Sequence, residues 1–114
     1  MRVFISGPIV GIRDYLEQFR AAETYIKDEY GKVEIVNPAE VMAKLPQKMM
    51  WHQYVDISLN MLRTCDAIFL LDGWEKSKSS QIERLYAEGC GMIFLFQGGA
   101  RFRKKHDSQY HWNG

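Results

Sequence analysis

The sequence lacks a long apolar run and an excess of charge of either sign. No stretch approaches the roughly 20 apolar residues that a membrane-spanning helix needs, so we expect no membrane partner. Lys and Arg number 15 against 14 Asp and Glu, which gives a net charge of +1. A nucleic-acid-binding domain would carry a strong basic surplus, so direct binding of DNA or RNA is not expected. The one local basic cluster is formed by Arg101, Arg103, Lys104 and Lys105.

Cysteine and histidine are also scarce. Cys65 and Cys90 are in or beside apolar segments, which predicts two buried free thiols in a reducing cytoplasm rather than a disulfide. The three histidines show no metal-ligand spacing with these cysteines, so we expect neither a zinc site nor a cofactor: they are His52, His106 and His111. After one arginine the N-terminus continues directly into an apolar strand pattern, and we therefore expect no signal peptide.

The pattern of apolar residues predicts one small α/β domain over residues 1–97, followed by a polar and aromatic tail over 98–114. Short apolar runs that predict strands alternate with segments of helical period. Unalternating apolar strands are typical of a parallel sheet that helices cover on both faces. The predicted strands are residues 2–6, 33–36, 67–71 and 92–96, and the predicted helices are residues 13–30, a short segment from 38, 51–63 and 80–88.

Residues 65–89 carry the strongest functional signal. A buried strand ends at Asp72, a loop with Trp74, Ser77, Ser79 and Ser80 follows, and the next helix contains Glu83. Ligands of open parallel sheets bind at the carboxyl ends of the strands. Ser80 and Glu83 have the spacing of a helix-capping box, which is one interpretation. The other is that the helix dipole keeps Glu83 ionised in the first turn, as a nucleophile for an anomeric carbon.

Two further features have both a functional and a structural interpretation. The loop after the first strand contains Ser6, Gly7, Pro8 and Gly11, and its backbone N–H groups could approach an anion or form a simple turn. Three large aromatic residues at helix starts and loop ends could stack on a base or belong to the core: Trp51, Tyr54 and Trp74.

Three short motifs together resemble the nucleoside 2-deoxyribosyltransferase-like superfamily. They are Ser6-Gly7-Pro8 after the first strand, Asn37-Pro38-Ala39 after the second, and Cys65-Asp66-Ala67-Ile68 leading into Gly73-Trp74-Glu75-Lys76-Ser77. Within that superfamily, the chain most resembles a small domain of unknown function that is common in phages and prophages. The resemblance covers most of residues 1–96. It implies a flavodoxin-like (Rossmann-like) three-layer sandwich, in which we predict a four-stranded, mostly parallel sheet of order 2-1-3-4, with chemistry at the N-glycosidic bond of a small nucleoside or nucleotide.

The resemblance also implies roles for individual residues. Glu83 matches the family nucleophile, Ser77 matches a serine that contacts the 5′-phosphate or 5′-hydroxyl, and the loop from Ser6 to Gly11 would close over the sugar. Family members are often dimers or tetramers. The apolar residues available for such an interface are Met42, Met49, Met50 and Trp51, so we expect a homo-oligomer.

The chain departs from the family pattern at two places. Catalytic members carry an acid/base Asp eight residues before the position that corresponds to Asp66. This chain has Ser58 there. Asp56 is two residues away from Ser58, about 200° around a helix, and cannot simply take its place. Ser79 and Ser80 occupy places where members often have Gly and Ala. Three functions therefore stay open: an N-glycosidic hydrolase or deoxyribosyltransferase, a non-catalytic nucleotide-binding or sensing protein, and a partner-binding phage accessory protein in which Glu83 is only a cap.

Overall fold

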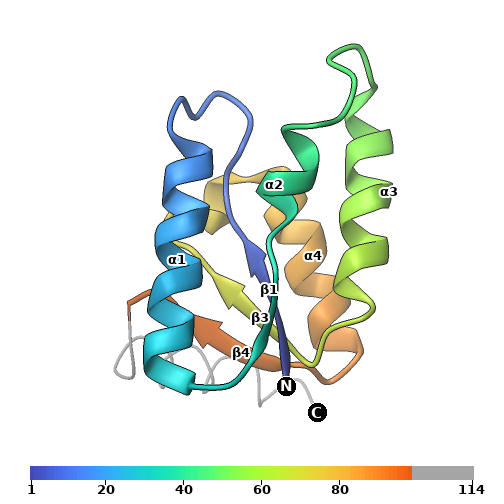
Figure 1. The fold of residues 1–114 in the computed structure, drawn as a ribbon. Coiled ribbons are helices and arrows are strands. Elements are labelled where there is room, and N and C mark those ends of the chain that lie inside the picture. Colours follow the sequence, from blue (N-terminus) through green and yellow to red (C-terminus); the bar gives the residue numbers. More distant parts are fainter. Residues whose placement is uncertain (99–114) are drawn as a thin grey trace.

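Four parallel strands form the central sheet of the computed structural model, which describes residues 1–98 (Figure 1). The strands are β1 (Arg2–Ser6), β2 (Glu34–Val36), β3 (Ala67–Leu70) and β4 (Ile93–Phe96). Their order is β2-β1-β3-β4 and every neighbouring pair is parallel, which confirms the predicted α/β class and strand order. The predicted tail and its basic cluster lie outside the described residues, apart from Gly98.

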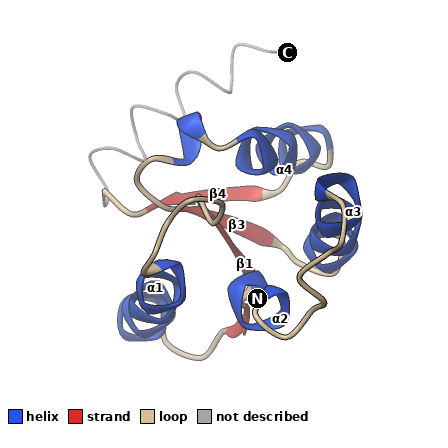
Figure 2. Cartoon of the chain, turned by 90° about the horizontal axis from the view of Figure 1, so that it is seen from above, coloured by secondary structure: helices blue, strands red, loops and turns tan. Residues whose placement is uncertain are grey.

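Helices cover both faces of this sheet, so the domain has three layers (Figure 2). Helix α1 packs on one face, α3 and α4 pack on the other, and α2 lies between α1 and α3. No helix within residues 1–98 is long and apolar enough to cross a membrane. The helical segments are α1 (Tyr15–Tyr30), α2 (Pro38–Met42), α3 (Trp51–Leu62), the 3₁₀ turn η1 (Trp74–Lys76) and α4 (Lys78–Gly89).

The alternation of side chains along β1 determines which layer each residue meets. Val3 and Ile5 point into the core beneath α1, whereas Phe4 points into the core beneath α3 and α4. Ser6 has the same parity as Phe4, so its hydroxyl lies on the α3–α4 side at the carboxyl end of the strand. A polar side chain is thereby placed at the edge where loops leave the sheet.

The register brings the two candidate loops to that same edge. Ser6 is paired with Leu70, and the backbone N–H of Leu71 donates to the carbonyl oxygen of Ser6 at 2.9 Å. The loops that follow β1 and β3 therefore start side by side. This confirms the expectation that the first loop lies next to the segment from Ser77 to Glu83.

The start of α4 differs from the prediction. Ser77 is its N-cap: Ser77 has an extended backbone, and its Oγ accepts a hydrogen bond from the backbone N–H of Ser80 at 3.3 Å. The interpretation of Ser80 and Glu83 as a capping box is therefore excluded, and Glu83 lies in the second turn rather than the first. The other predicted element ends coincide with the observed ones or differ from them by at most two residues, a normal uncertainty for ends that hydrogen bonding defines.

The two cysteines are free, and only one of them is buried. Cys65 packs in the core on the α3–α4 side, as predicted. Cys90 is exposed, contrary to the prediction, because it is the C-cap of α4, where the chain turns toward β4.

Gly7 occupies a position with no room for a side chain. A Cβ there would lie 2.6 Å from Cδ1 and 2.9 Å from Cβ of buried Leu71. We therefore expect Gly7→Ala to lower the free energy of unfolding in urea by about 1–3 kcal/mol. Gly89→Ala is the matched control, because a Cβ at this position meets no atom within 4 Å. We expect this change, within helix α4, to raise the free energy of unfolding by at most about 1 kcal/mol. Equal destabilisation by both changes would contradict this packing.

Candidate functional site

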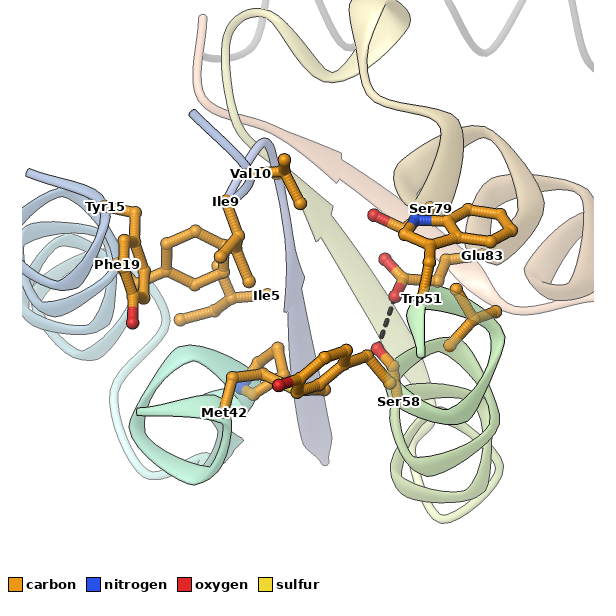
Figure 3. A pocket seen from close by; sticks show the side chains of 14 residues that line it. Ile5, Ile9, Val10, Tyr15, Phe19, Met42, Trp51, Ser58, Ser79 and Glu83 are labelled. Carbon is orange, nitrogen blue, oxygen red and sulfur yellow. Dashed lines mark hydrogen bonds between the residues drawn. The ribbon is translucent and has the colours of Figure 1, made fainter. Parts of the chain in front are cut away.

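A cavity of about 210 Å³ opens at the carboxyl edge of the sheet, between α1, α2, α3 and the start of α4 (Figure 3). Its size is below the range of about 300–1,000 Å³ that drug-sized ligands occupy, so it suits a nucleoside better than a dinucleotide. The lining comes from β1, the first loop and the four α-helices. It consists of Ile5, Gly7, Ile9, Val10, Tyr15, Phe19, Pro38, Met42, Trp51, Tyr54, Val55, Ser58, Ser79 and Glu83.

Glu83 provides the carboxyl group of this cavity. Its side chain is only 5% exposed, and two serines from different elements hold it. The Oγ of Ser6, at the end of β1, donates to Oε1 at 2.6 Å. The Oγ of Ser58, on α3, donates to Oε2, as the dashed line in Figure 3 shows. Both oxygens are thus fixed in position beside the ligand space, and neither is used to cap the helix.

The electrostatics of Glu83 differ from the sequence-based expectation. Burial raises the pKa of this carboxyl to about 7, while the hydrogen bonds from Ser58 and Ser6 oppose that rise. The expected stabilisation of its charge by the helix dipole is therefore wrong, because Glu83 lies in the second turn and desolvation outweighs the favourable contacts. Near neutral pH both protonation states are populated, as is common for catalytic carboxyl groups.

The opposite end of the cavity is apolar. Ile9, Tyr15, Phe19 and Met42 lie there, across the cavity from Ser58, Ser79 and Glu83 (Figure 3). This arrangement offers apolar and aromatic contacts at one end and a carboxyl group with hydroxyls at the other. A base attached to a sugar has the same division of properties.

Two aromatic residues of α3 complete the wall. Trp51 is 44% exposed, and Tyr54 donates its hydroxyl to the carbonyl oxygen of Pro46 at 2.6 Å, which fixes its ring. Their position on the cavity agrees with the interpretation that they could stack on a base.

Four of the residues predicted from the sequence come together at this site: Gly7, Ser79 and Glu83 line the cavity, and Ser6 donates a hydrogen bond to Glu83 from behind the lining. Ser79 lines the cavity near the start of α4, and its Oγ shares a hydrogen bond of 3.2 Å with the Oγ of Ser77. The convergence follows from the strand order, since β1 and β3 are neighbours.

The other six predicted residues, all in the described part of the chain, do not line the cavity: Pro8, Gly11, Asp72, Trp74, Ser77 and Ser80. Trp74 is buried in the core on the α3–α4 side, so its structural interpretation is the one observed. Asp72 is exposed, and its backbone N–H donates to Oε1 of Gln97 at 2.7 Å. Ser77 caps α4, and Ser80 is fully buried within the helix.

Ser58 is the main site residue that the sequence interpretation missed as a binding partner. The spacing to Asp66 identifies this position in the sequence, but only as one where the carboxyl group of the family pattern is absent. In the structure Ser58 lies on the buried face of α3, together with Val55 and Leu62. The residues at the apolar end of the cavity could not be identified as site residues from the sequence, because every helix that packs on a sheet shows the same apolar pattern.

Within residues 1–98 there is no group of three or more His, Cys, Asp or Glu side chains that could hold a metal ion. The groups available for chemistry in the cavity are therefore the carboxyl of Glu83, the hydroxyls of Ser58 and Ser79, and the phenols of Tyr15 and Tyr54.

Comparison with known proteins gives one family and one fold. A family described as a domain of unknown function, DUF4406, matches residues 1–96. No curated protein matches the chain in sequence. Among solved structures, a 2-deoxyribosyltransferase from Leishmania mexicana is similar, with 20% identity and a TM-score of 0.60 over 83% of this chain and 62% of that one. At this identity the likeness shows a shared fold, and the chain spans less than two thirds of that enzyme.

Proposed function

We propose that this chain, which belongs to the DUF4406 family, breaks the N-glycosidic bond of a small nucleoside or nucleotide. The reaction would be hydrolysis, or transfer of the deoxyribosyl group to another base. The observation that carries the proposal is the buried carboxyl of Glu83, held by Ser6 and Ser58 at the wall of a cavity of about 210 Å³. The shared fold with a 2-deoxyribosyltransferase supports it.

The arrangement supports a direct role for Glu83 at the sugar. A carboxylate whose two oxygens are fixed by hydroxyls can approach C1′ without first reorganising. Attack by one oxygen would give a glycosyl ester, and water or a second base would then take the sugar. The aromatic and apolar walls would hold the base while the bond breaks.

A panel assay tests this proposal. Purified protein is incubated with ribonucleosides, deoxyribonucleosides and their 5′-monophosphates, and free base is followed by chromatography. Release of base from at least one class is the expected result. No release from any of them would remove the support for catalysis.

The second candidate function is a non-catalytic nucleotide-binding or sensing module on the same fold. It is favoured by Ser58, which has a hydroxyl at the position where catalytic members of the superfamily that the sequence resembles carry an Asp. Binding of a nucleoside or nucleotide without release of base would favour this candidate. A phage or prophage source and a cytoplasmic location stay predictions from the sequence.

Ser58 provides a test of how the carboxyl group is tuned. Because its hydroxyl hydrogen bond opposes the rise of the Glu83 pKa, Ser58→Ala should raise that pKa further above about 7. If the ionised carboxylate is the active form, the rising limb of kcat/KM against pH should move to higher pH. Titration of the carboxyl resonance by NMR gives the same information without activity. Thr24→Ala, which removes an exposed hydroxyl from α1, should leave the midpoint in place. An unmoved midpoint in Ser58→Ala would contradict the tuning.

Assembly of the chain with copies of itself is a further prediction. Of the residues proposed for an interface, Met50 is 62% and Trp51 is 44% exposed, while Met42 lines the cavity. Val10 is 82% exposed and lies on the first loop, so Val10 and Trp51 both expose apolar surface at the cavity. Light scattering at high micromolar concentration should show a dimer or larger oligomer, and a monomer would contradict this prediction.

A further inference from the structure

The cavity is short of proton donors. Within the described residues, Glu83 is the only carboxyl group in its lining, and no Asp, His, Lys or Arg side chain lines it. The hydroxyl of Ser58 is directed to Glu83, and that of Tyr54 is directed to the carbonyl oxygen of Pro46 at 2.6 Å. Among the acidic side chains of the described lining, the phenol of Tyr15 and the carboxyl of Glu83 are therefore the two left to donate a proton to a leaving base.

This shortage matters for the leaving group. The base of a neutral nucleoside departs as an anion unless it takes up a proton, and a positioned general acid contributes about 10²-fold to 10⁴-fold to such a step. Glu83 must be ionised when it attacks C1′, so it has no proton to give at that moment. A heterocycle that already carries a positive charge on the glycosidic ring system needs no proton, because it departs neutral.

The walls of the cavity suit a cationic ring. Aromatic side chains line it at Tyr15 and Phe19 on α1 and at Trp51 and Tyr54 on α3, and the faces of aromatic rings attract cations. Glu83 supplies the one carboxyl group, and no lining side chain in the described part of the chain would repel a positive charge. Figure 3 shows Tyr15 and Phe19 across the cavity from Trp51 and Glu83, so a ligand in the cavity would lie between aromatic walls.

We propose that the preferred substrates are nucleosides whose base carries a positive charge, such as N-ribosylpyridinium compounds and N7-alkylated purine nucleosides; this rests on the function proposed above. In the first step an oxygen of Glu83 bonds to C1′, the C1′–N bond breaks, and its electron pair neutralises the departing ring. In the second step water attacks C1′, the carboxylate of Glu83 leaves, and the proton of water goes to solvent. Each cleavage consumes one water and releases one proton.

The test uses pairs of nucleosides that differ in the charge of the base. Nicotinamide riboside is compared with inosine, and N7-methylguanosine with guanosine, using the full chain and subtracting the rate without enzyme. Because general acid catalysis is worth about 10²-fold to 10⁴-fold, the cationic member of each pair should have a kcat/KM at least about 10²-fold higher. With nicotinamide riboside, the rate should rise as Glu83 ionises and then stay level with pH.

Three results would count against the inference, and they separate it from the proposed function. Equal kcat/KM for charged and neutral members, with activity lost in Glu83→Gln, would overturn the inference and keep the proposed function. A falling limb at high pH with nicotinamide riboside would show that a group such as Tyr15 donates a proton, and would overturn it in the same way. No release of base from either class would overturn both.

Discussion

The Glu83→Gln variant is expected to be more stable than the wild type at about pH 8, by roughly 3 kcal/mol in the free energy of unfolding. The reason is the cost of burying an ionised carboxylate. Burial raises the pKa of Glu83 from 4.5 to about 7, so the folded protein binds a proton that the unfolded chain has already lost. Glutamine is neutral at every pH and can accept a hydrogen bond from one serine and donate one to the other.

The sign of this effect sets its pH window. Below about pH 4 both states of the wild type hold the proton, so Glu83 adds no pH dependence there. As the pH rises from about 4.5 to 7 the unfolded chain ionises first, and the wild type loses stability. Above that window the loss is complete and stays constant.

Urea unfolding of both proteins at about pH 4 and about pH 8 measures the effect. The difference between variant and wild type should be small at the lower pH and large at the higher. Glu75→Gln, which exchanges an exposed carboxylate on η1, controls for the general effect of removing one negative charge. A difference of the same size at both pH values would show that the carboxyl is not desolvated as described.

This expected gain bears directly on why the chain has glutamate at this position. A neutral residue of the same shape would stabilise the fold, so stability does not explain a carboxyl group buried against Ser6 and Ser58. Groups that cost stability in the fold are characteristic of functional sites. The position is therefore more consistent with a chemical role than with a structural one.

The architecture could be predicted from the sequence because its signals are local. Apolar runs such as residues 67–71 identify strands, and their alternation with helices implies a parallel sheet. The expected order brought Ser6 and Glu83 to one edge, and the structure confirms that order.

The environment of Glu83 could not be predicted in the same way. The Ser-x-x-Glu pattern at Ser80 is consistent with a cap, but Ser77, three residues earlier, is the residue that caps the helix. Whether Glu83 caps the helix or faces the cavity depends on contacts made across the fold, namely the hydrogen bonds that Ser6 of β1 and Ser58 of α3 donate to it. The raised pKa likewise depends on burial, which no local pattern encodes.

Replacement of Glu83 by glutamine is also expected to lower the rate of base release by on the order of 10³-fold or more. The amide keeps the shape of the side chain but cannot act as an anionic nucleophile. Because glutamine can occupy the same place between Ser6 and Ser58, the affinity for a neutral nucleoside should change little. Loss of rate with retained binding separates a chemical role from a role in shaping the cavity.

One binding measurement and two controls make this result interpretable. Quenching of tryptophan fluorescence by the ligand reports binding, since Trp51 lies on the cavity wall. Glu75→Gln should release base at the wild-type rate, because its carboxylate lies outside the cavity lining. Circular dichroism of each variant establishes that it is folded.

The most direct measurement is the release of free base from one nucleoside by wild type and Glu83→Gln, side by side, with chromatographic detection. We predict release by the wild type and a rate at least about 10³-fold lower in the folded variant. Equal release by the two proteins, or no release by the wild type from any nucleoside or nucleotide, would contradict a catalytic Glu83.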